Sequence, residues 1–400
     1  MKEVYHILIA IVTLLFTTLC TNAANKNDNY VLLPDSSNFV TASLVVVSPG
    51  DNVYSALGHC AIRLECPIHK LDYCFSFGTN TATDEDFLQF FAGKLEAGFL
   101  ALPTEGFLKE YEMEGREVKQ VELNLSLHEQ QRLWQMLDED MVGGSFRTFN
   151  YLQNNCSSLA LKAIEWSLIG EELTVNKWPK QMEMINGDGV RYLSRLRPWL
   201  SFVNMTLLGS ESDTYWEQEH RISPELIIEA LNHATISPID SVAPRPVFKS
   251  MPVTLLQKRS EIHTTPFTPT VVFGILLAIV ILITVLEWSL HMHKVAKILD
   301  VILLAAQTIA GIALIYMSTV ACLFGLHWNW YLIVFNPLPA ILWFILRKKS
   351  WYPKLYLAYS IILLAFISFW PLTTQIDLEH QLITMALLTR CASKYFFLKK

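Results

Sequence analysis

The last third of the chain is too apolar to fold in water, which constrains its architecture more than any other feature. Apolar stretches follow one another there at about residues 271–290, 298–323, 331–346, 355–372 and 382–398. A helix needs about 20 apolar residues to cross a bilayer, and the first stretch reaches that length. The whole chain is 52% hydrophobic, and the surplus lies here and at the extreme N-terminus. We therefore expect residues 270–400 to form an all-α membrane domain of about five transmembrane helices.

Positive charge predicts how these helices are oriented. Basic residues gather after the first and third stretches and at the end of the fifth, at Lys294, Lys297, Arg347, Lys348, Lys349, Lys354, Arg390, Lys394, Lys399 and Lys400. The connections at residues 325–330 and 373–381 contain neither Lys nor Arg. Cytoplasmic loops carry the excess of positive charge in membrane proteins. This rule places the C-terminus in the cytoplasm and the residues before 270 outside it.

The N-terminus independently predicts export. Residues 1–24 combine Lys2, an apolar run over residues 7–16 and small residues at Ala23 and Ala24, as a secretory signal peptide does. An uncleaved anchor is the alternative. Leu19 precedes Cys20 where a lipoprotein signal has a small residue, so we do not interpret this segment as a lipoprotein signal. The formal net charge of -6 indicates no basic surface, and we expect no nucleic-acid partner.

Between these ends the sequence predicts an exported α+β domain over residues 25–169 and an extracytoplasmic extension over residues 170–269. Strands are predicted at residues 41–47, 55–64, 72–77 and 120–125, from β-branched and alternating apolar patterns. Helices are predicted at residues 84–93, 126–140, 156–168 and 224–234. The second helix opens with Ser126 and Glu129, which match a capping box.

The start of the helix at residues 156–168 contains the first candidate catalytic residue. Asn154 and Asn155 form a polar turn, and Cys156 follows in the first helical turn. Asparagine is a favoured N-cap, and the free N–H groups and dipole at a helix start favour an anion. These features would lower the pKa of Cys156 and make its thiolate a nucleophile. The alternative is that Cys156 is a buried small hydrophobic residue.

His59 is the candidate base for Cys156, because it lies in a predicted strand beside Gly58. A thiol enzyme also needs a third group to orient the base, and we assign this role to Asp72 at the start of the next strand. Ser76 and Asn80 are alternatives to Asp72, and a solvated Asp72 or a core His59 is the non-catalytic interpretation. The backbone N–H of Cys156 would contribute to the oxyanion hole.

The remaining cysteines and histidines predict no cofactor. Cys66 and Cys74 flank the loop between two predicted strands and could form a disulfide, although sequence does not fix the pairing. The eleven histidines are scattered, and His291 and His293 have no thiol or carboxylate nearby in sequence, so no metal site is predicted.

The order of the candidate residues, histidine strand before cysteine helix, reverses that of papain. It resembles the circularly permuted branch of the NlpC/P60 (papain-like) superfamily, which includes lecithin:retinol acyltransferase-like thiol enzymes. Further motifs resemble the Bacteroides-type lipoprotein N-acyltransferases (Lnb). They are Ser55 to Leu64 with His59 and Arg63, Glu112 to Arg116, Asn154-Asn155-Cys156, Pro198-Trp199 with Leu208-Gly209 and Pro224-Glu225-Leu226, and His327 to Trp330 with Asn336-Pro337-Leu338. The sequence departs from the family at Ala56, Leu57 and Cys60, which removes no group that the chemistry needs.

This resemblance implies an activity and a location. The family moves an acyl chain from a phospholipid to the N-terminal S-diacylglyceryl cysteine of a lipoprotein, here through a thioester on Cys156. A phospholipid donor, a lipoprotein acceptor and the membrane are the expected partners. The expected location is the bacterial inner (cytoplasmic) membrane, as a multi-pass protein with the catalytic domain on the periplasmic side.

The resemblance also suggests residues that bind substrate. They are Asn155, Arg63, Arg116, His327, Asn329 and Asn336. The arginines suit a phosphate, since a guanidinium forms paired hydrogen bonds with it, and structural salt bridges are the alternative. Polar groups within a membrane are costly and often functional, which favours His327 and Asn336. Trp328 and Trp330 are typical of an interfacial aromatic belt.

Two other functions are compatible with parts of the sequence. A cell-wall peptidase or amidase is the commoner use of the NlpC/P60 fold, but a polar substrate would not require five membrane helices. A membrane receptor or binding module with a degenerate site is the other possibility, and the presence of both Cys156 and His59 counts against it.

Overall fold

The structure is a computed structural model. It describes residues 40–53, 55–79, 84–150, 154–217, 222–238, 243–263, 265–321, 329–346, 352–369, 372–373 and 376–399. The predicted signal peptide, Asn80 and His327 lie outside the described residues.

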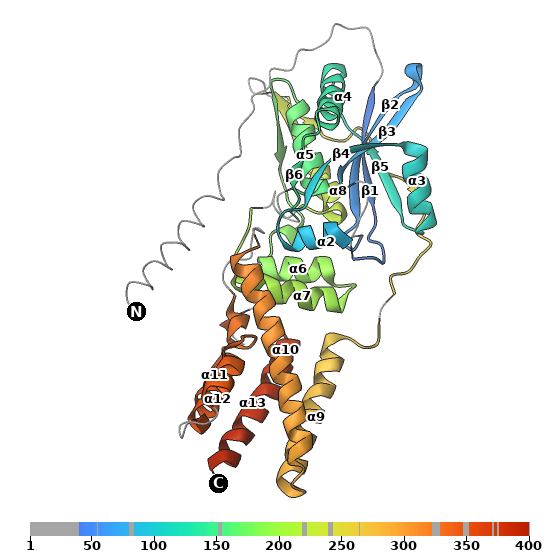
Figure 1. Ribbon diagram of the computed structural model, residues 1–400. Coiled ribbons are helices and arrows are strands. Elements are labelled where there is room, and N and C mark those ends of the chain that lie inside the picture. The colour runs from blue at the N-terminus through green and yellow to red at the C-terminus, as the bar shows by residue number, and fades with distance from the viewer. Residues whose placement is uncertain are drawn as a thin grey trace. The chain divides into compact units, whose positions relative to one another are not determined.

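A seven-stranded antiparallel sheet forms the core of the N-terminal part of the chain (Figure 1). In spatial order its strands are β10 (Val253–Leu256), β5 (Val118–Glu122), β1 (Thr41–Val47), β2 (His59–Cys66), β3 (Leu71–Gly78), β4 (Glu96–Pro103) and β6 (Arg147–Thr148). Strand β10 comes from the segment just before the membrane helices and pairs with β5. The sheet is therefore completed by residues far along the chain from the other strands.

Alternate residues of each strand point to opposite faces of the sheet, and each face is buried. Leu44 and Ile62 belong to the larger apolar cluster, which includes residues of α4 (Leu127–Val142), α5 (Cys156–Ser167) and α8 (Pro224–Asn232). Val45 and Ala61 face the opposite side, where they pack with α3 (Thr104–Met113). Figure 1 shows α3 on one side of the sheet and α4 and α5 on the other. The structure thus confirms a mixed α/β domain.

Several predicted elements are confirmed and others were missed. The strand at residues 41–47 and the capping box are confirmed, with Glu129 N–H donating to Ser126 Oγ at 3.4 Å and Ser126 N–H donating to the Glu129 carboxylate at 2.7 Å. The strand predicted from residue 55 begins only at His59, because Gly58 has a φ of +87° and closes a turn with Ser55. Strand β4 and helix α3 were not predicted. Helix α2 (Asp84–Phe91) lies where a helix was expected.

The extension after α5 is more ordered than predicted. Strands β7 (Glu171–Val175), β8 (Ala234–Pro238) and β9 (Arg245–Pro246) form a second sheet. Helices α6 (Asn186–Ser194) and α7 (Pro198–Leu208) precede α8, and short 3-10 segments occur in the extension at Lys180–Met182 and Gly209–Asp213. A further 3-10 segment, Pro67–His69, joins β2 to β3.

The predicted disulfide between Cys66 and Cys74 is wrong, because both cysteines are free and buried. Cys74 pairs with Arg63 in the ladder between β2 and β3. Cys66 lies three positions further along β2, which is about 10 Å in an extended strand. A disulfide requires Cα atoms within about 7 Å.

The C-terminal part of the chain is helical. Its helices are α9 (Pro269–Ser289), α10 (His293–Thr319), α11 (Leu338–Leu346), α12 (Tyr352–Ser368) and α13 (Leu378–Lys399). Helices α9 and α10 are long and apolar enough to cross a membrane, and the apolar helices at residues 330–345 and 352–368 are shorter. The predicted third helix is interrupted between the 3-10 turn Trp330–Ile333 and Leu338. Pro337 lies in that break and lacks the N–H that a continuous helix needs.

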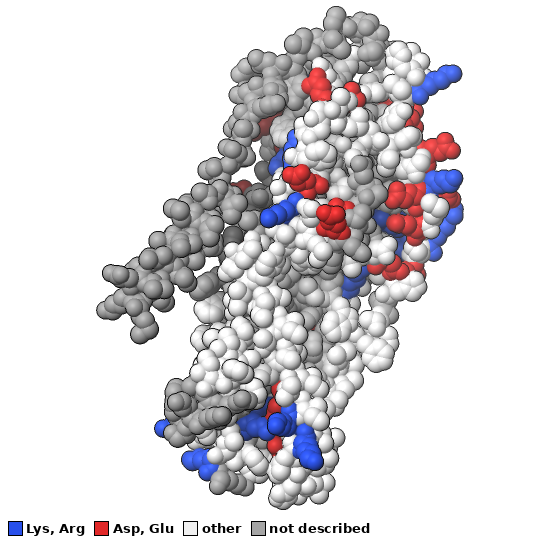
Figure 2. Space-filling model, in the orientation of Figure 1, with Lys and Arg blue, Asp and Glu red and all other residues white. Residues whose placement is uncertain are grey.

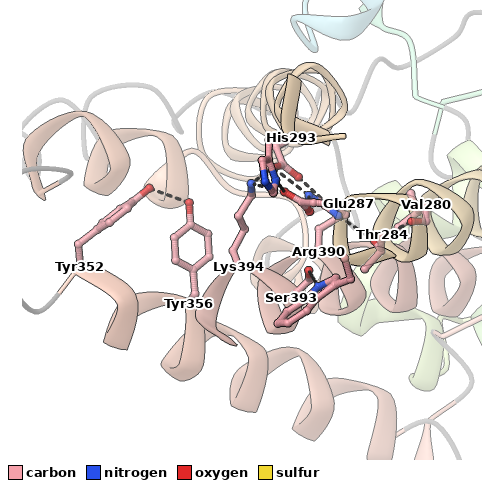
Figure 3. Close-up of polar contacts among 11 residues, drawn as sticks. Val280, Thr284, Glu287, His293, Tyr352, Tyr356, Arg390, Ser393 and Lys394 are labelled. Atoms are coloured by element: carbon pink, nitrogen blue, oxygen red, sulfur yellow. Dashed lines mark hydrogen bonds and ion pairs between the residues drawn. The ribbon is translucent and has the colours of Figure 1, made fainter. Parts of the chain in front are cut away.

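Basic side chains of the helical part gather at one end. On the face shown in Figure 2, basic residues cluster at that end, and the described surface between them and the charged residues of the N-terminal domain is uncharged. Figure 3 shows that the same end contains an internal ion cluster between α9, α10 and α13. Arg390 donates to Asp300 at 2.6 Å and to Glu287 at 2.9 Å, and Lys394 lies 2.9 Å from Asp300. The outer faces of these helices therefore suit lipid, and their buried charges are paired.

Candidate active site

Cys156 is the first residue of α5, as predicted, and Asn155 is the N-cap. The Oδ1 of Asn155 accepts hydrogen bonds from the N–H groups of Ser157 at 2.8 Å and Ser158 at 2.9 Å. The N–H of Asn155 donates to Ser158 Oγ at 3.0 Å, which completes a capping box. Asn155 therefore fixes the start of the helix, and its contact with substrate stays a prediction.

The prediction that the helix start lowers the pKa of Cys156 is wrong. Burial raises the pKa of the thiol, and hydrogen bonds from the backbone N–H of Cys60 and from Ser157 offset only part of the increase. The N–H groups of Ser157 and Ser158 donate to the Asn155 cap, and the backbone N–H groups of Cys156 and Ser157 lower the pKa of the thiol by less than burial raises it. Cys156 is consequently a thiol at neutral pH, and it needs a base before it can act as a nucleophile.

His59 begins β2 directly after Gly58. A Cβ at Gly58 would lie 2.6 Å from the carbonyl oxygen of Val47, so only glycine allows this approach. The His59 ring packs against Phe107 and Tyr111, at centroid distances of 6.4 and 6.3 Å. Burial lowers the pKa of His59 to about 4, and the charge of Arg116 acts in the same direction. His59 is therefore neutral near pH 7 and able to accept a proton.

The cysteine and histidine motifs meet at the start of β2. The N–H that reaches the Cys156 sulfur belongs to Cys60, the residue after His59, and α5 packs against β2 and β3. Burial raises the pKa of the Tyr111 phenol, and the nearby Cys156 contributes a smaller increase. Both residues are described, and no hydrogen bond joins the His59 ring to the sulfur. Such bonds are often long before substrate binds.

The prediction that Asp72 orients His59 is wrong. Asp72 pairs with Glu65 in the ladder between β2 and β3, six residues along β2 from His59. That separation is about 20 Å in an extended strand. The carboxylate accepts two hydrogen bonds from Arg63, at 2.8 and 2.7 Å, and one from Thr104 at 2.5 Å. Within the described residues the His59 ring has no carboxylate partner, and its contacts are aromatic.

Arg63 on β2 is the partner of Asp72 on β3. Its Nε and Nη2 bind Asp72, and its Nη1 donates to Gln120 at 2.8 Å on β5. Arg63 therefore joins β2, β3 and β5, and these contacts favour the structural alternative to phosphate binding.

Arg116, unlike Arg63, lies beside the candidate base His59. Its guanidinium lies 4.8 Å from the centre of the Tyr111 ring, and its charge lowers the pKa of His59. Nε donates to the carbonyl oxygen of Ser48 at 2.7 Å, and Nη1 pairs with Glu114 at 2.9 Å.

The amides predicted to bind substrate in the membrane domain are used structurally. Asn329 donates to the carbonyl oxygen of Thr206 at 2.7 Å and accepts from the N–H of Tyr331 at 2.9 Å, so it attaches this segment to α7. Asn336 donates to the carbonyl oxygen of Ile333 at 3.0 Å and accepts from the N–H of Leu338 at 3.1 Å. A contact of either amide with substrate stays a prediction. His327 lies outside the described residues.

Sequence reasoning missed two residues near the site. Tyr111 packs against His59, and Arg197 donates to the carbonyl oxygen of Ala56 at 3.0 Å. Arg197 precedes Pro198-Trp199, a motif noted in the sequence without a role for the arginine. No local sequence pattern could have predicted this contact, because Arg197 and Ala56 are 141 residues apart in the chain.

Two family models match the chain. The model described as the Lnb N-terminal periplasmic domain matches residues 34–188, which include His59 and Cys156. The model described as the Lnb transmembrane domain matches residues 259–400, which include all the helices from α9 to α13. Comparisons with curated proteins and with solved structures found no match.

Proposed function

Because the chain belongs to the Lnb family, we propose that it is a thiol acyltransferase that N-acylates lipoproteins. It is a membrane protein with a periplasmic N-terminal domain and a helical transmembrane domain. The proposed donor is a phospholipid, and the proposed acceptor is the α-amine of an S-diacylglyceryl cysteine. We further propose that the membrane is the inner membrane and that the C-terminus is cytoplasmic.

One observation carries the thiol mechanism. The thiol at the start of α5 receives a hydrogen bond from the residue next to a neutral, half-buried histidine. A neutral thiol and a neutral imidazole suit proton transfer during attack, because His59 can take the proton as the sulfur bonds to carbon.

The first half-reaction forms a thioester. His59 takes the thiol proton, and the sulfur of Cys156 attacks the ester carbonyl carbon of the phospholipid. The carbon–oxygen ester bond breaks, and the imidazolium returns the proton to the leaving oxygen, which gives a lysophospholipid. The N–H of Cys156 at the start of α5 is the proposed donor to the oxyanion.

The second half-reaction transfers the acyl group to nitrogen. The α-amine of the lipoprotein cysteine attacks the thioester carbon, and the carbon–sulfur bond breaks. His59 removes a proton from the attacking amine and delivers it to the Cys156 sulfur. The products are an amide and the original thiol, so the two steps consume no oxidant or reductant.

The direct test is the intact mass of the purified full-length protein after incubation with phospholipid. We expect a gain of one fatty-acyl mass that hydroxylamine removes, together with release of lysophospholipid. Cys156→Ala is expected to show neither, whereas Cys66→Ala, at a buried cysteine outside the site, is expected to keep both.

Each other result supports a different function. Lysophospholipid release without an adduct would indicate rapid hydrolysis of the thioester. No adduct and no release, with cleavage of cell-wall peptides that depends on Cys156, would support the peptidase or amidase. Retention of the biological function in Cys156→Ala would support a membrane receptor or binding module.

The pKa of His59 predicts the acid limb of the reaction. A histidine with the usual pKa of 6.5 is about 90% protonated at pH 5.5, whereas one with a pKa of about 4 is about 3% protonated. Because the pKa of His59 is low, its imidazole stays neutral and can act as the base down to about pH 4. The value of kcat/KM for thioester formation should therefore stay nearly constant from pH 7 to 5 and decrease below pH 5. A decrease centred near pH 6.5 would contradict the burial of His59 or its role as the base.

A further inference from the structure

Two arginines hold the connection between β1 and β2 from opposite ends. Arg116 donates from Nε to the carbonyl oxygen of Ser48 at 2.7 Å, just after β1. Arg197 donates from Nη1 to the carbonyl oxygen of Ala56 at 3.0 Å, just before His59. Gly50 N–H bonds to the carbonyl oxygen of Ser55 at 2.9 Å, which folds the connection back on itself. Both guanidiniums therefore lie beside the strand start that bears His59.

Each guanidinium retains one buried donor without an acceptor in the described part of the chain. These donors are Nη2 of Arg116 and Nη2 of Arg197. Arg116 is 4% exposed, so its Nη2 has no access to bulk solvent. An unpaired buried donor costs free energy, and that of a charged group costs most.

The two guanidiniums also repel one another. Burial lowers the pKa of Arg197, Asp51 opposes this effect, and the positive charge of Arg116 lowers the pKa further. The Asp51 carboxylate is itself paired with the ring of His263, and it accepts a hydrogen bond from the backbone N–H of His263 at 2.9 Å. Two like charges with two unused donors form an arrangement that an anion would stabilise.

The position of Arg197 indicates which anion. Arg197 is the residue before α7, and Trp199 in the first turn of α7 donates to the carbonyl oxygen of Phe267 at 2.8 Å. Trp199 and Phe202 pack on Phe273 of α9, with ring centroids 5.9 and 5.1 Å apart. Phe267 and Phe273 mark the beginning of the first membrane helix. Tryptophan at such a boundary lies among lipid headgroups, where the phosphates are.

We propose that Arg116 and Arg197 bind the phosphodiester of the glycerophospholipid acyl donor and so hold its ester near Cys156. This inference rests on the proposed function and adds the recognition of the donor. The acceptor S-diacylglyceryl cysteine contains no phosphate, so the two arginines serve the first half-reaction only. Arg116 and Arg197 bind substrate, and they take no part in proton transfer.

The test compares donors with and without phosphate, using the full-length protein in detergent micelles. Acylation of Cys156 is measured with dioleoylphosphatidylethanolamine and with p-nitrophenyl oleate. For Arg197→Gln we expect kcat/KM to decrease about 10- to 100-fold with the phospholipid, the usual effect of losing a charge-assisted hydrogen bond. The rate with p-nitrophenyl oleate and the aminolysis of a preformed thioester should not change.

A matched control is available two residues away. Arg195 is on the surface and pairs with Glu225, so Arg195→Gln should leave both donors unaffected. Arg197→Lys keeps the charge but loses the planar fork, and it should give an intermediate decrease with the phospholipid alone.

A binding measurement separates this inference from the proposed function. A diether phosphatidylethanolamine cannot be cleaved, so its affinity reports recognition even if no acyl transfer occurs. Arg197→Gln should weaken its binding at least about tenfold. Equal loss with both acyl donors, or unchanged binding of the diether lipid, would overturn the inference. Stabilisation of the wild type by millimolar inorganic phosphate, with lipid binding unchanged in Arg197→Gln, would assign the pair to a free anion and overturn it too.

Discussion

Replacing His59 by glutamine is expected to slow thioester formation about 1000-fold at pH 7, within the range for loss of a general base. Burial raises the pKa of Cys156, so the thiolate is a very small fraction of the protein at this pH. His59 is neutral and can take the proton as the sulfur attacks. Glutamine has a similar length and no basic nitrogen, so it removes the proton acceptor and preserves most of the packing against Phe107 and Tyr111.

The pH dependence of this variant separates a base from a packing residue. Without a base only the preformed thiolate reacts, so the rate of His59→Gln should increase about tenfold for each pH unit from 7 to 9. The wild-type rate should be nearly constant over that range. His69→Gln, at an exposed histidine of the same domain, is the control and should behave as the wild type. A large loss in His59→Gln with no increase at high pH would mean that His59 supports the fold instead.

Local signals predicted much of the fold because their causes lie within a few residues. The capping box at Ser126 and Glu129 needs only two side chains one helical turn apart, and the structure confirms it. The helix at Cys156 was predicted from its Asn155 cap and its apolar spacing, and it begins at the expected residue. The strand at residues 41–47 was evident because β-branched residues fill it.

Strand register and burial could not be predicted in this way. Asp72 follows His59 closely in sequence, but β2 and β3 form a hairpin, so Asp72 lies beside Glu65 at the far end of β2. The pKa of Cys156 depends on burial and on hydrogen bonds from Cys60, which no residue near Cys156 in the sequence indicates. These two errors changed the assigned chemistry from a preformed thiolate with an acidic third residue to a neutral thiol beside an aromatic-packed histidine.

Contacts between distant segments were also invisible in the sequence. Arg197 reaches Ala56, and β10 joins the sheet from the segment before the membrane helices. The polar residues Asn329 and Asn336 were noticed because polar groups are rare in membranes, but they stabilise turns around the Pro337 break. Because polar residues are rare in membranes, the sequence indicated that these amides have a role. Their hydrogen bonds in the structure were needed to show that they stabilise turns.

Replacing Arg390 by methionine is expected to destabilise the helical domain by about 3 kcal/mol, the lower end of the usual range for breaking a buried ion pair. Glu287 and Arg390 are 1% and 4% exposed and come from α9 and α13. Arg390 also donates to Asp300 of α10 and to Thr284 of α9, at 2.6 and 2.8 Å (Figure 3). Methionine fills a similar volume, so the predicted loss comes from the two carboxylates that lose their principal partner.

A second substitution identifies the source of this loss. Glu287→Gln in the Arg390→Met background removes one of the two carboxylates that lost Arg390 and should restore part of the stability, which thermal unfolding of the purified protein in detergent measures. Lys399→Met, at an exposed position of the same helix, is the matched control and should change stability little. Glu287 would retain Lys394 at 3.3 Å in the single variant, so the loss should be smaller than for a carboxylate with no cation nearby. If Arg390→Met and Lys399→Met were equally stable, the ion cluster would not join the three helices, and apolar packing of α13 against α9 and α12 would suffice.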